Sequence, residues 1–416
     1  MAKLVVLGGS AVATPELVRA IRQLPERHHL LSIVLYARRA ERLESVAGVA
    51  SLMAEGDPLL QVSWTTDLSQ ALEGADLVLN QIRAGGLEAR AFDESFPLEL
   101  GIPGEETVGP GGFSNAFRTI PPSLEYARKM EQVCPTAQLF NFANPSSMVQ
   151  YAIQKYSQIK VIGLCNGPIS AFEKIAAALN LTLQSLSFDY LGMHHFGWVT
   201  GVWQNGKNMM PEVLAKAEQV ADGVEPELIR AIGAVPGPYF NYFFHADRML
   251  EKKRGKPTRA EELLDLQDEL LDEYKASLRD QQLPGGIQRR KARWYADIVA
   301  PVLNAFVEQD TYSASGTAPL FYLNVKNGNT IPWLPADAVV EVPVIIEKGR
   351  ARPVCSGDAP PDVKAMLQSN CAYEMLAVEA IVENDRGKAL RALLRNPLVH
   401  TYDQAVQIIE RVWNQK

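Results

Sequence analysis

The chain has 416 residues, of which 47% are hydrophobic and 21% are charged, and its formal net charge at pH 7 is −7. This length predicts roughly two to three domains, and the composition is that of a soluble protein able to bury a sizeable core. The negative charge disfavours a nucleic acid or an anionic membrane as the main partner.

Strands and helices alternate in the first part of the chain. Lys3–Leu7 is a short apolar strand, and a glycine turn separates it from a helix that begins at Thr14-Pro15-Glu16, with Thr14 as its N-cap. Further strands are expected at Leu30–Tyr36, Val62–Thr65, Ala75–Ile82, Ala137–Phe142 and Lys160–Leu164, and helices at Ala40–Met53, Pro122–Gln132 and Met148–Tyr156. Continuously apolar strands that alternate with helices predict a Rossmann-like, doubly wound parallel sheet.

The pattern changes after about residue 168. A long acidic helix is expected at Ala260–Leu278, and strands at Leu186–Tyr190, Val199–Trp203, Leu320–Val325 and Val339–Ile346. We therefore divide the chain into a dinucleotide-binding domain, residues 1–167, and a mixed α/β domain, residues 168–416. Because no linker rich in Pro, Gly or Ser separates them, we expect the two parts to pack tightly.

The turn Gly8-Gly9-Ser10-Ala11 follows a strand and precedes a helix. Backbone N–H groups and the helix dipole at such a turn favour a bound pyrophosphate, although the degenerate motif also suits an ordinary turn. The second strand ends in Arg38 and Arg39, where sites that prefer NAD usually carry an acid. These arginines either hold a 2′-phosphate or begin a solvated helix.

Reactive side chains follow later strand ends. Asn144 lies just after one strand, Cys165 and Asn166 follow the next, and adjacent imidazoles occur at His194 and His195. A thiolate and an imidazole suit a borderline divalent metal, although their spacing of about 30 residues is not a short zinc-type motif. A nucleophilic Cys/His pair and simple core packing of the thiol stay open as alternatives.

Two glycine-rich segments and an aromatic run are further candidates. Arg83 and Arg90 flank Gly85-Gly86, and Gly104–Gly112 carries two adjacent acids; flexible surface loops would explain both segments. Tyr239 lies in the run PGPYFNYFF. Such aromatic residues usually belong to the core, but a tyrosine near a cation can act as a base because positive charge lowers its pKa from about 10.

The chain shows no sign of secretion or membrane insertion. Its first apolar stretch is too short for a signal peptide, and no run approaches the roughly 18 apolar residues of a membrane span. The four cysteines are sparse and unclustered. We therefore expect a cytoplasmic protein with free thiols.

Taken together and in this order, these segments resemble glycoside hydrolase family 4, the NAD- and metal-dependent 6-phosphoglycosidases. The resemblance covers nearly the whole chain. It rests on GGSAVATPEL from Gly8, IRAGGLEARAFDESFPLELGIPGEETVGPGGF from Ile82, NFANPSSMV from Asn141, GLCN from Gly163, GMHHFGW from Gly192 and NVKNGNTIPWLPADAVVEVP from Asn324.

The resemblance implies a reaction that does not use a pair of catalytic carboxylates. NAD accepts a hydride from C3 of the sugar, Mn²⁺ polarises the resulting ketone as a Lewis acid, and a tyrosine removes the C2 proton before the aglycone is eliminated. The expected cofactors are therefore NAD and Mn²⁺. The implied fold adds to the Rossmann-like domain a C-terminal domain of the lactate/malate dehydrogenase type, which carries the substrate and metal sites.

Residue roles follow from the same resemblance. Tyr239 matches the catalytic base, and Cys165 and His195 match the metal ligands. The expected substrate-binding residues are Arg90, Glu106, Asn144, Asn166 and Arg290, and the expected cofactor-binding residues are Gly8, Gly9, Ser10, Ala11, Arg38 and Arg39. His194 replaces the usual Asn before the metal histidine, and QRRKARWY from Gln288 lacks the family's Gly-Gly.

The sequence Cys165-Asn166 resembles the β-glucoside branch of the family, which predicts a 6-phospho-β-glucosidase. The expected partner is a phosphorylated disaccharide or aryl glucoside, and the expected assembly is a homodimer or homotetramer. The alternatives are a phospho-α-glycosidase, an unphosphorylated glycosidase, a 2-hydroxy-acid dehydrogenase, and a non-catalytic sensor of sugar phosphates or nucleotides.

Overall fold

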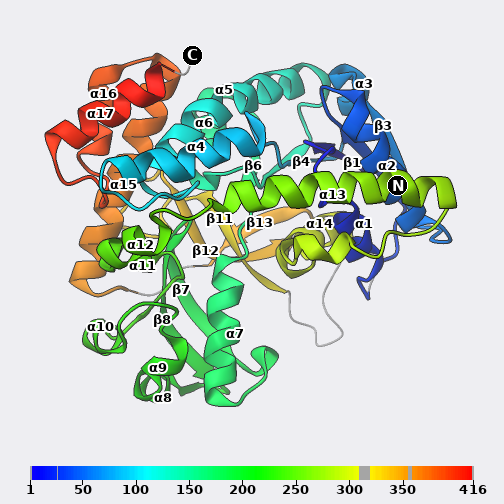
Figure 1. The fold of residues 1–416 in the computed structure, drawn as a ribbon. Helices are drawn as coiled ribbons and strands as arrows, with labels where there is room; N and C mark the ends of the chain where they lie inside the picture. Colours follow the sequence, from blue (N-terminus) through cyan, green and yellow to red (C-terminus); the bar gives the residue numbers. More distant parts are fainter. Residues whose placement is uncertain (1, 26, 309–318, 355–357, 415–416) are drawn as a thin grey trace.

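The computed structural model describes residues 2–25, 27–308, 319–354 and 358–414. Within them, thirteen strands form one sheet that runs through the molecule (Figure 1). Six strands lie in the order β3-β2-β1-β4-β5-β6, and neighbouring strands are parallel. Their bounds are β1 Ala2–Leu7, β2 Leu31–Tyr36, β3 Leu60–Thr65, β4 Leu77–Asn80, β5 Gln138–Asn141 and β6 Val161–Gly163. This order is that of the Rossmann fold, so the predicted doubly wound sheet is confirmed.

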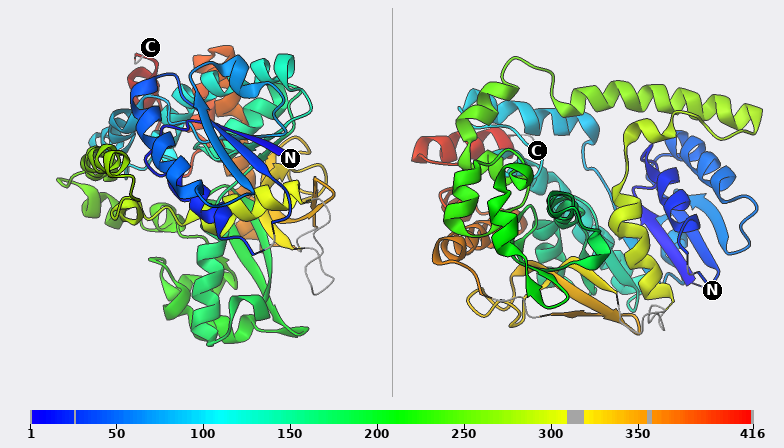
Figure 2. Two further views of the ribbon diagram at one scale, coloured as in Figure 1. Left: turned by 90° about the vertical axis from the view of Figure 1, so that its right-hand side faces the viewer. Right: turned by 90° about the horizontal axis from the view of Figure 1, so that it is seen from below.

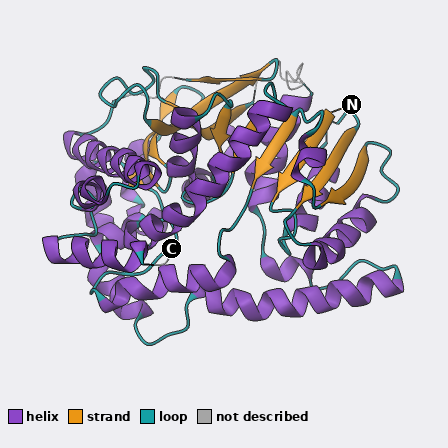
Figure 3. Ribbon diagram, turned by 90° about the horizontal axis from the view of Figure 1, so that it is seen from above, coloured by secondary structure: helices purple, strands orange, loops and turns teal. Residues whose placement is uncertain are grey.

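The parallel strands are apolar throughout because both faces of this part of the sheet are covered. Along β1, Leu4 and Val6 belong to one hydrophobic cluster, whereas Val5 and Leu7 belong to a second one. Successive side chains of a strand point to opposite faces, so the two clusters lie on the two sides of the sheet. Helices surround the strands on these sides (Figure 3).

Beyond β6 the sheet continues with antiparallel strands in the order β11-β12-β7-β8-β10, with β13 beside β12 and β9 beside β8. Their bounds are β7 Ser187–Met193, β8 Phe196–Gln204, β9 Lys207–Asn208, β10 Val235–Pro236, β11 Leu320–Lys326, β12 Val339–Glu347 and β13 Arg350–Pro353. The four strands predicted after residue 168 are therefore confirmed. Gly163 of β6 pairs with Asn324 of β11, so a single sheet contains strands from both predicted domains. The domain boundary between residues 167 and 168 stays a prediction.

The helices cover the sheet and join its two parts. Helix α13 runs past α2 and α4 (Figure 2), and α15 packs on α5 and α6. The helix bounds are α1 Thr14–Arg22, α2 Ala40–Ala54, α3 Leu68–Leu72, α4 Gly86–Glu99, α5 Gly109–Val133, α6 Ser146–Tyr156, α7 Gly167–Leu179, α8 Met210–Ala215, α9 Ala217–Val220, α10 Pro226–Ile232, α11 Phe240–Phe244, α12 Ala246–Lys253, α13 Arg259–Asp280, α14 Ala300–Val307, α15 Pro361–Glu383, α16 Arg386–Leu393 and α17 Tyr402–Trp413. In the described part of the chain, none of them is long and apolar enough to cross a membrane.

Two local predictions were wrong. Thr14 is the first residue of α1 rather than its N-cap, which is Ala13; the Thr14 hydroxyl instead accepts a hydrogen bond from Gln81 Nε2 at 3.0 Å. Helix α5 begins at Gly109 and not at Pro122, and it continues through both internal prolines. Burial of its apolar face outweighs the two backbone hydrogen bonds that these prolines remove.

The segment Gly104–Gly112 is not a flexible surface loop, because all nine of its residues are buried. Its glycines are required by close packing. A Cβ at Gly104 would lie 1.8 Å from the Glu94 carbonyl oxygen, and one at Gly111 would lie 2.1 Å from the Glu105 carbonyl oxygen. The segment is therefore a fixed wall that holds its two acids in place.

Candidate active site

A cleft of about 960 Å³ opens at the carboxyl ends of β1, β4, β5 and β6, beside the turn between β7 and β8. Open α/β sheets bind their ligands at this edge. The residues singled out from the sequence that line the cleft are Gly8, Ser10, Ala11, Arg38, Arg90, Glu106, Asn144, Cys165, Asn166, His195, Tyr239 and Arg290. Tertiary folding thus brings together side chains that are separated by up to 282 residues in the sequence.

The turn between β1 and α1 has the geometry of a site for an anion. Gly8 has a φ of +86°, and a Cβ there would lie 2.9 Å from the carbonyl oxygen of Gln81. Helix α1 has no side-chain cap, so no protein side chain occupies the N–H groups at its start. The turn therefore fits the pyrophosphate of a dinucleotide.

Two predicted cofactor residues lie outside the cleft. A Cβ on Gly9 would lie 2.8 Å from Cβ of Leu35, so this glycine is needed where the turn packs on β2. Arg39 is exposed and is the N-cap residue of α2. Neither Gly9 nor Arg39 lines the cleft. Their role in cofactor binding stays a prediction.

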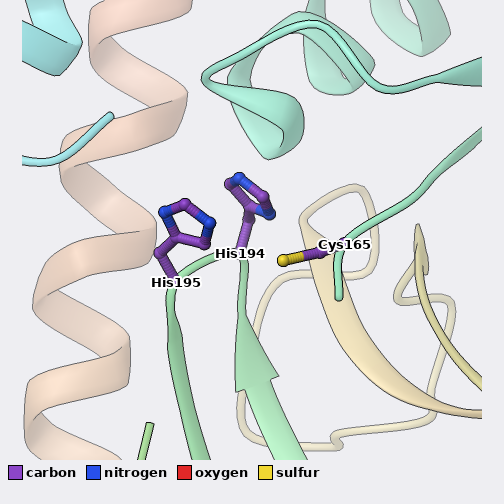
Figure 4. A group of neighbouring side chains, drawn as sticks. All are labelled: Cys165, His194 and His195. Atoms are coloured by element: carbon purple, nitrogen blue, oxygen red, sulfur yellow. The ribbon is translucent and has the colours of Figure 1, made fainter. Parts of the chain in front are cut away.

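Cys165, His194 and His195 form a compact cluster on the cleft wall. Their ligand atoms lie within 4.8 Å of one another, and the thiol points toward the imidazoles from a separate segment of the chain (Figure 4). Nδ1 of each histidine is buried without a hydrogen-bond partner among the described residues. Sulfur and imidazole nitrogen are suitable ligands for a borderline divalent metal, so these orphaned atoms fit a metal ion.

The two histidines are the tight turn of the β7–β8 hairpin, between the paired residues Met193 and Phe196. His195 has a φ of +58°, a conformation that costs a residue with a side chain about 1–3 kcal/mol and is typical of functional sites. Burial lowers the pKa of His194 to about 3. Burial, and then the neighbouring His194, lower the pKa of His195 well below its usual value. Both rings are therefore neutral, which is the form that binds metals.

A buried carboxyl group, that of Glu341, lies next to the Cys165 thiol. Glu341 is 1% exposed and accepts hydrogen bonds from the Tyr190 hydroxyl at 2.6 Å and from Asn324 Nδ2 at 3.1 Å. Burial, and then the charge of Glu341, raise the pKa of Cys165 well above its usual value. A thiol in this state is a poor free nucleophile, whereas a metal ion deprotonates a thiol that it binds.

Tyr239 lies flat against the second histidine. The ring centroids of Tyr239 and His195 are 3.7 Å apart, and their planes differ by 10°. The loop is anchored by Gly237, whose N–H donates to the Gly197 carbonyl oxygen at 2.8 Å. Burial, and then the negative charge of Glu105, raise the pKa of Tyr239 well above its usual value. A tyrosinate at this position therefore requires added positive charge, which a cation at the neighbouring cluster would supply.

Cationic side chains line the cleft around Glu106. This carboxylate pairs with Arg83 and, at 3.0 Å, with Arg90 Nη1. Although burial raises the pKa of Glu106, the charges of Arg83 and Arg90 hold it below its usual range. Arg90 also donates from Nε to Glu94 at 2.7 Å.

Arg290 differs from its neighbours because, in the described part of the chain, it has no carboxylate partner. Its guanidinium lies 4.9 Å from the ring centroid of Trp294. Burial, and then the charges of Arg83 and Arg90, lower the pKa of Arg290 to about 10. The preceding Arg289 is exposed and pairs with two glutamates outside the cleft, so the structure decides which of the adjacent arginines faces the site.

The two carboxamides lie next to the cluster. Asn144 Oδ1 is 3.2 Å from Nε2 of His194, and Asn166 directly follows Cys165 on the cleft wall. From the sequence, His194 was named only as one of two adjacent imidazoles, and neither Glu341 nor Arg42 was singled out. His194 and Arg42 line the cleft, and Glu341 lies next to Cys165. The doubled imidazole was a signal for His194, but no local pattern marked the other two.

Comparisons with known proteins show the family to which the chain belongs. Residues 3–181 match the Family 4 glycosyl hydrolase domain, and residues 190–399 match the Family 4 glycosyl hydrolase C-terminal domain. The chain therefore belongs to glycosyl hydrolase family 4, which confirms the resemblance found in the sequence. Membership of the family does not distinguish the two anomers, because similar relatives are named as 6-phospho-beta-glucosidases and as phospho-alpha-glucosidases.

The chain is 32% identical to the probable 6-phospho-beta-glucosidase of Bacillus subtilis (strain 168), over 99% of this chain and 95% of the relative. It is 29% identical to the phospho-alpha-glucosidase PagL of Clostridium acetobutylicum, over 97% of this chain and 95% of the relative. The structure of the 6-phospho-beta-glucosidase from Thermotoga maritima with manganese, NAD⁺ and glucose-6-phosphate superposes with a TM-score of 0.87 and 26% identity, over 99% and 98% of the two chains.

A lactate dehydrogenase of Trichomonas vaginalis has a similar fold, with a TM-score of 0.57 and 11% identity over 92% of this chain and 100% of the other. This likeness confirms the predicted dehydrogenase-like architecture and nothing about activity.

Proposed function

We propose that this chain hydrolyses 6-phospho-β-glucosides with the help of a nicotinamide dinucleotide and a divalent metal ion such as Mn²⁺. The observation that carries the proposal is the joint placement of Cys165, His195 and Tyr239 on one wall of the cleft. The metal-type donors and the tyrosine ring are in direct contact there. Relatives with 6-phospho-beta-glucosidase names support the substrate class.

The chain supplies a place for each cofactor. The Gly8 turn and the uncapped start of α1 would hold the pyrophosphate, and Cys165 with His195 would hold the metal, with His194 in reach. When bound, these groups would supply reversible hydride transfer at C3 of the sugar and Lewis-acid polarisation of the C3 oxygen.

The remaining chemistry falls to protein side chains. Tyr239 removes the proton from C2, which oxidation at C3 makes acidic, and the aglycone then leaves from C1. Water adds to C1 and the proton returns to C2, so that return of the hydride to C3 would complete a hydrolysis with no net redox change. Because Tyr239 has a raised pKa in the protein alone, its action as a base depends on the positive charge of the neighbouring metal site.

The cationic wall of the cleft recognises the phosphate. Arg290 is the guanidinium without a carboxylate partner in the described structure, and Arg90 lies close enough to affect its pKa. A guanidinium binds phosphate through paired hydrogen bonds. Glu106 holds Arg90 in place by an ion pair at 3.0 Å. Asn144 and Asn166 contact the sugar beside the metal, and the Cys165-Asn166 pair favours the β-anomer.

The proposal is tested by release of p-nitrophenol from p-nitrophenyl 6-phospho-β-glucoside in the presence of dinucleotide, Mn²⁺ and a thiol reductant. Release from the β-anomer alone is expected. Release from the α-anomer would assign the chain to phospho-α-glucosides, and release from the unphosphorylated glucoside would remove the phosphate assignment. Turnover of any of these compounds would exclude a non-catalytic sensor.

We also propose a cytoplasmic homodimer or homotetramer. A cytoplasmic place is supported by the free thiols of Cys134, Cys165 and Cys371, which are all buried. Light scattering coupled to size-exclusion chromatography measures the assembly directly; a mass of 45.9 kDa would identify a monomer and contradict the proposal.

A further inference from the structure

The end of the cleft beside β2 carries two arginines. Arg38 follows β2, Arg42 lies in the first turn of α2, and both line the cleft. Two aromatic residues, Tyr36 and Tyr126, line the same end, and the charge of Arg38 lowers the pKa of each phenol against the larger effect of burial. The guanidinium of Arg38 therefore lies near these hydroxyl groups.

This end of the cleft is where the adenosine ribose of a dinucleotide would lie. Strands β1 and β2 are paired in parallel up to Leu7 and Tyr36. The N–H groups of Gly8 and Gly9 donate to the Tyr36 carbonyl oxygen at 3.1 and 2.9 Å, so the pyrophosphate turn touches the end of β2. In Rossmann folds the residue at the end of this strand faces the 2′ position of the ribose, and an acid or an arginine there distinguishes the two cofactor forms.

The charges at this end favour an anion. In the described part of the chain, neither Arg38 nor Arg42 forms an ion pair or a hydrogen bond, whereas Arg19 and Arg27 on nearby elements pair with carboxylates. Helix α2 also lacks a side-chain cap at its start, so its dipole adds positive character. Unpaired guanidinium groups are suited to a phosphate dianion.

One acid, Glu125, borders the same end of the cleft from α5. It does not come from β2, and it forms no ion pair with Arg38 or Arg42 in the described structure. A second acid, Asp67, is near enough to act on Tyr36, but it caps helix α3 and does not line the cleft. Among the cleft-lining residues at this end, two cations therefore face one acid, which leaves a net positive charge. Glu125 therefore weakens the binding of a 2′-phosphate without cancelling it.

We propose that Arg38 and Arg42 form a subsite for the 2′-phosphate of NADP, so that this chain binds NADP more tightly than NAD. The proposal rests on the proposed function for the presence of a dinucleotide, and it adds which form the chain selects. It also separates the two adjacent arginines of the sequence motif, because Arg38 lines the cleft and Arg39 does not.

The test is isothermal titration calorimetry of the full chain with NADP⁺ and NAD⁺ separately, at low and high salt. NADP⁺ is expected to bind at least tenfold more tightly, which is about 1.4 kcal/mol. The difference should shrink as salt rises, because exposed charges are screened. Arg38→Ala and Arg42→Ala should each weaken NADP⁺ binding and leave NAD⁺ binding within twofold, whereas Glu125→Gln should strengthen NADP⁺ binding.

The matched control is Arg128→Ala, which removes an exposed arginine of α5 that does not line the cleft. It should change neither affinity. Equal affinities for the two dinucleotides, tighter binding of NAD⁺, or equal losses for both in Arg38→Ala would overturn the subsite. If NAD⁺ alone binds and supports glycoside cleavage, the subsite is wrong but the proposed function stands; if neither dinucleotide binds, both are wrong.

Discussion

Arg290 offers the sharpest test of phosphate recognition, because its neighbour in the sequence is a natural control. Arg290 faces the cleft without a carboxylate partner among the described residues, and burial together with Arg83 and Arg90 lowers its pKa to about 10. It is therefore still charged at pH 7, and repulsion from like charges is relieved when a phosphate dianion binds. Arg289 pairs with Glu269 at 2.7 Å and with Glu273 at 3.0 Å on the surface.

The expected effect of Arg290→Ala follows from these contacts. Hydrogen bonds to charged groups contribute about 1.5–3 kcal/mol, which corresponds to a loss of about 10- to 150-fold in kcat/KM for the phosphorylated glucoside. The inhibition constant of glucose 6-phosphate should rise by a similar factor, and that of unphosphorylated glucose should not change. Arg289→Ala breaks only exposed ion pairs, which contribute about 0–1 kcal/mol to stability, so its kinetics should equal those of the unmodified chain.

Steady-state kinetics at fixed dinucleotide and Mn²⁺ concentrations measure these values. Circular dichroism of each variant shows whether the fold is retained. Three results would refute the reasoning: an unchanged kcat/KM in Arg290→Ala, a comparable loss in Arg289→Ala, or equal losses of affinity for glucose and for glucose 6-phosphate.

The other predictions concern the metal site and the buried acids. Cys165→Ser should abolish high-affinity Mn²⁺ binding measured by calorimetry, and retained binding would remove the metal assignment. Tyr239→Phe should bind Mn²⁺ normally but lose exchange of the C2 proton with deuterated solvent, so undiminished exchange would exclude it as the base. Glu341→Ala leaves two buried donors without an acceptor, at about 1–3 kcal/mol each, whereas Glu341→Gln should lose less in urea denaturation; equal losses would contradict this. Burial raises the pKa of Glu374 from 4.5 to about 7. The folded state therefore binds the extra proton between these values, and Glu374→Gln should gain up to about 3 kcal/mol relative to the unmodified chain as the pH rises from 4.5 to 7; a pH-independent difference would refute the shift.

Hydrophobic patterning was enough to predict the architecture of the first half of the chain. Continuously apolar strands that alternate with helices require a sheet covered on both faces, and the buried residues of β1 are distributed over two clusters as this demands. Local patterns also located Cys165, His195 and Tyr239, because their chemistry is unusual at strand ends and turns. Local patterns did not predict how close these three residues lie to one another in the folded chain.

Local rules failed where packing outweighed intrinsic preference. Helix α5 continues through Pro121 and Pro122 because burying the side chains of its apolar face compensates for the missing hydrogen bonds. The buried Gly104–Gly112 segment resembled a flexible loop because glycine permits both mobility and close backbone approach. Close packing, and not mobility, explains these glycines, because carbonyl groups of the folded chain lie directly against most of them.

Which charged side chains face the cleft depends on long-range packing and not on local sequence. Arg38 and Arg290 line it, while Arg39 and Arg289, one residue away in the sequence, do not. Glu341 meets Cys165 only because β12 and β6 are both held beside β11 in the sheet. Adjacent residues with the same side chain have the same local preferences, so long-range pairing and helix direction determine which of them is exposed to a ligand.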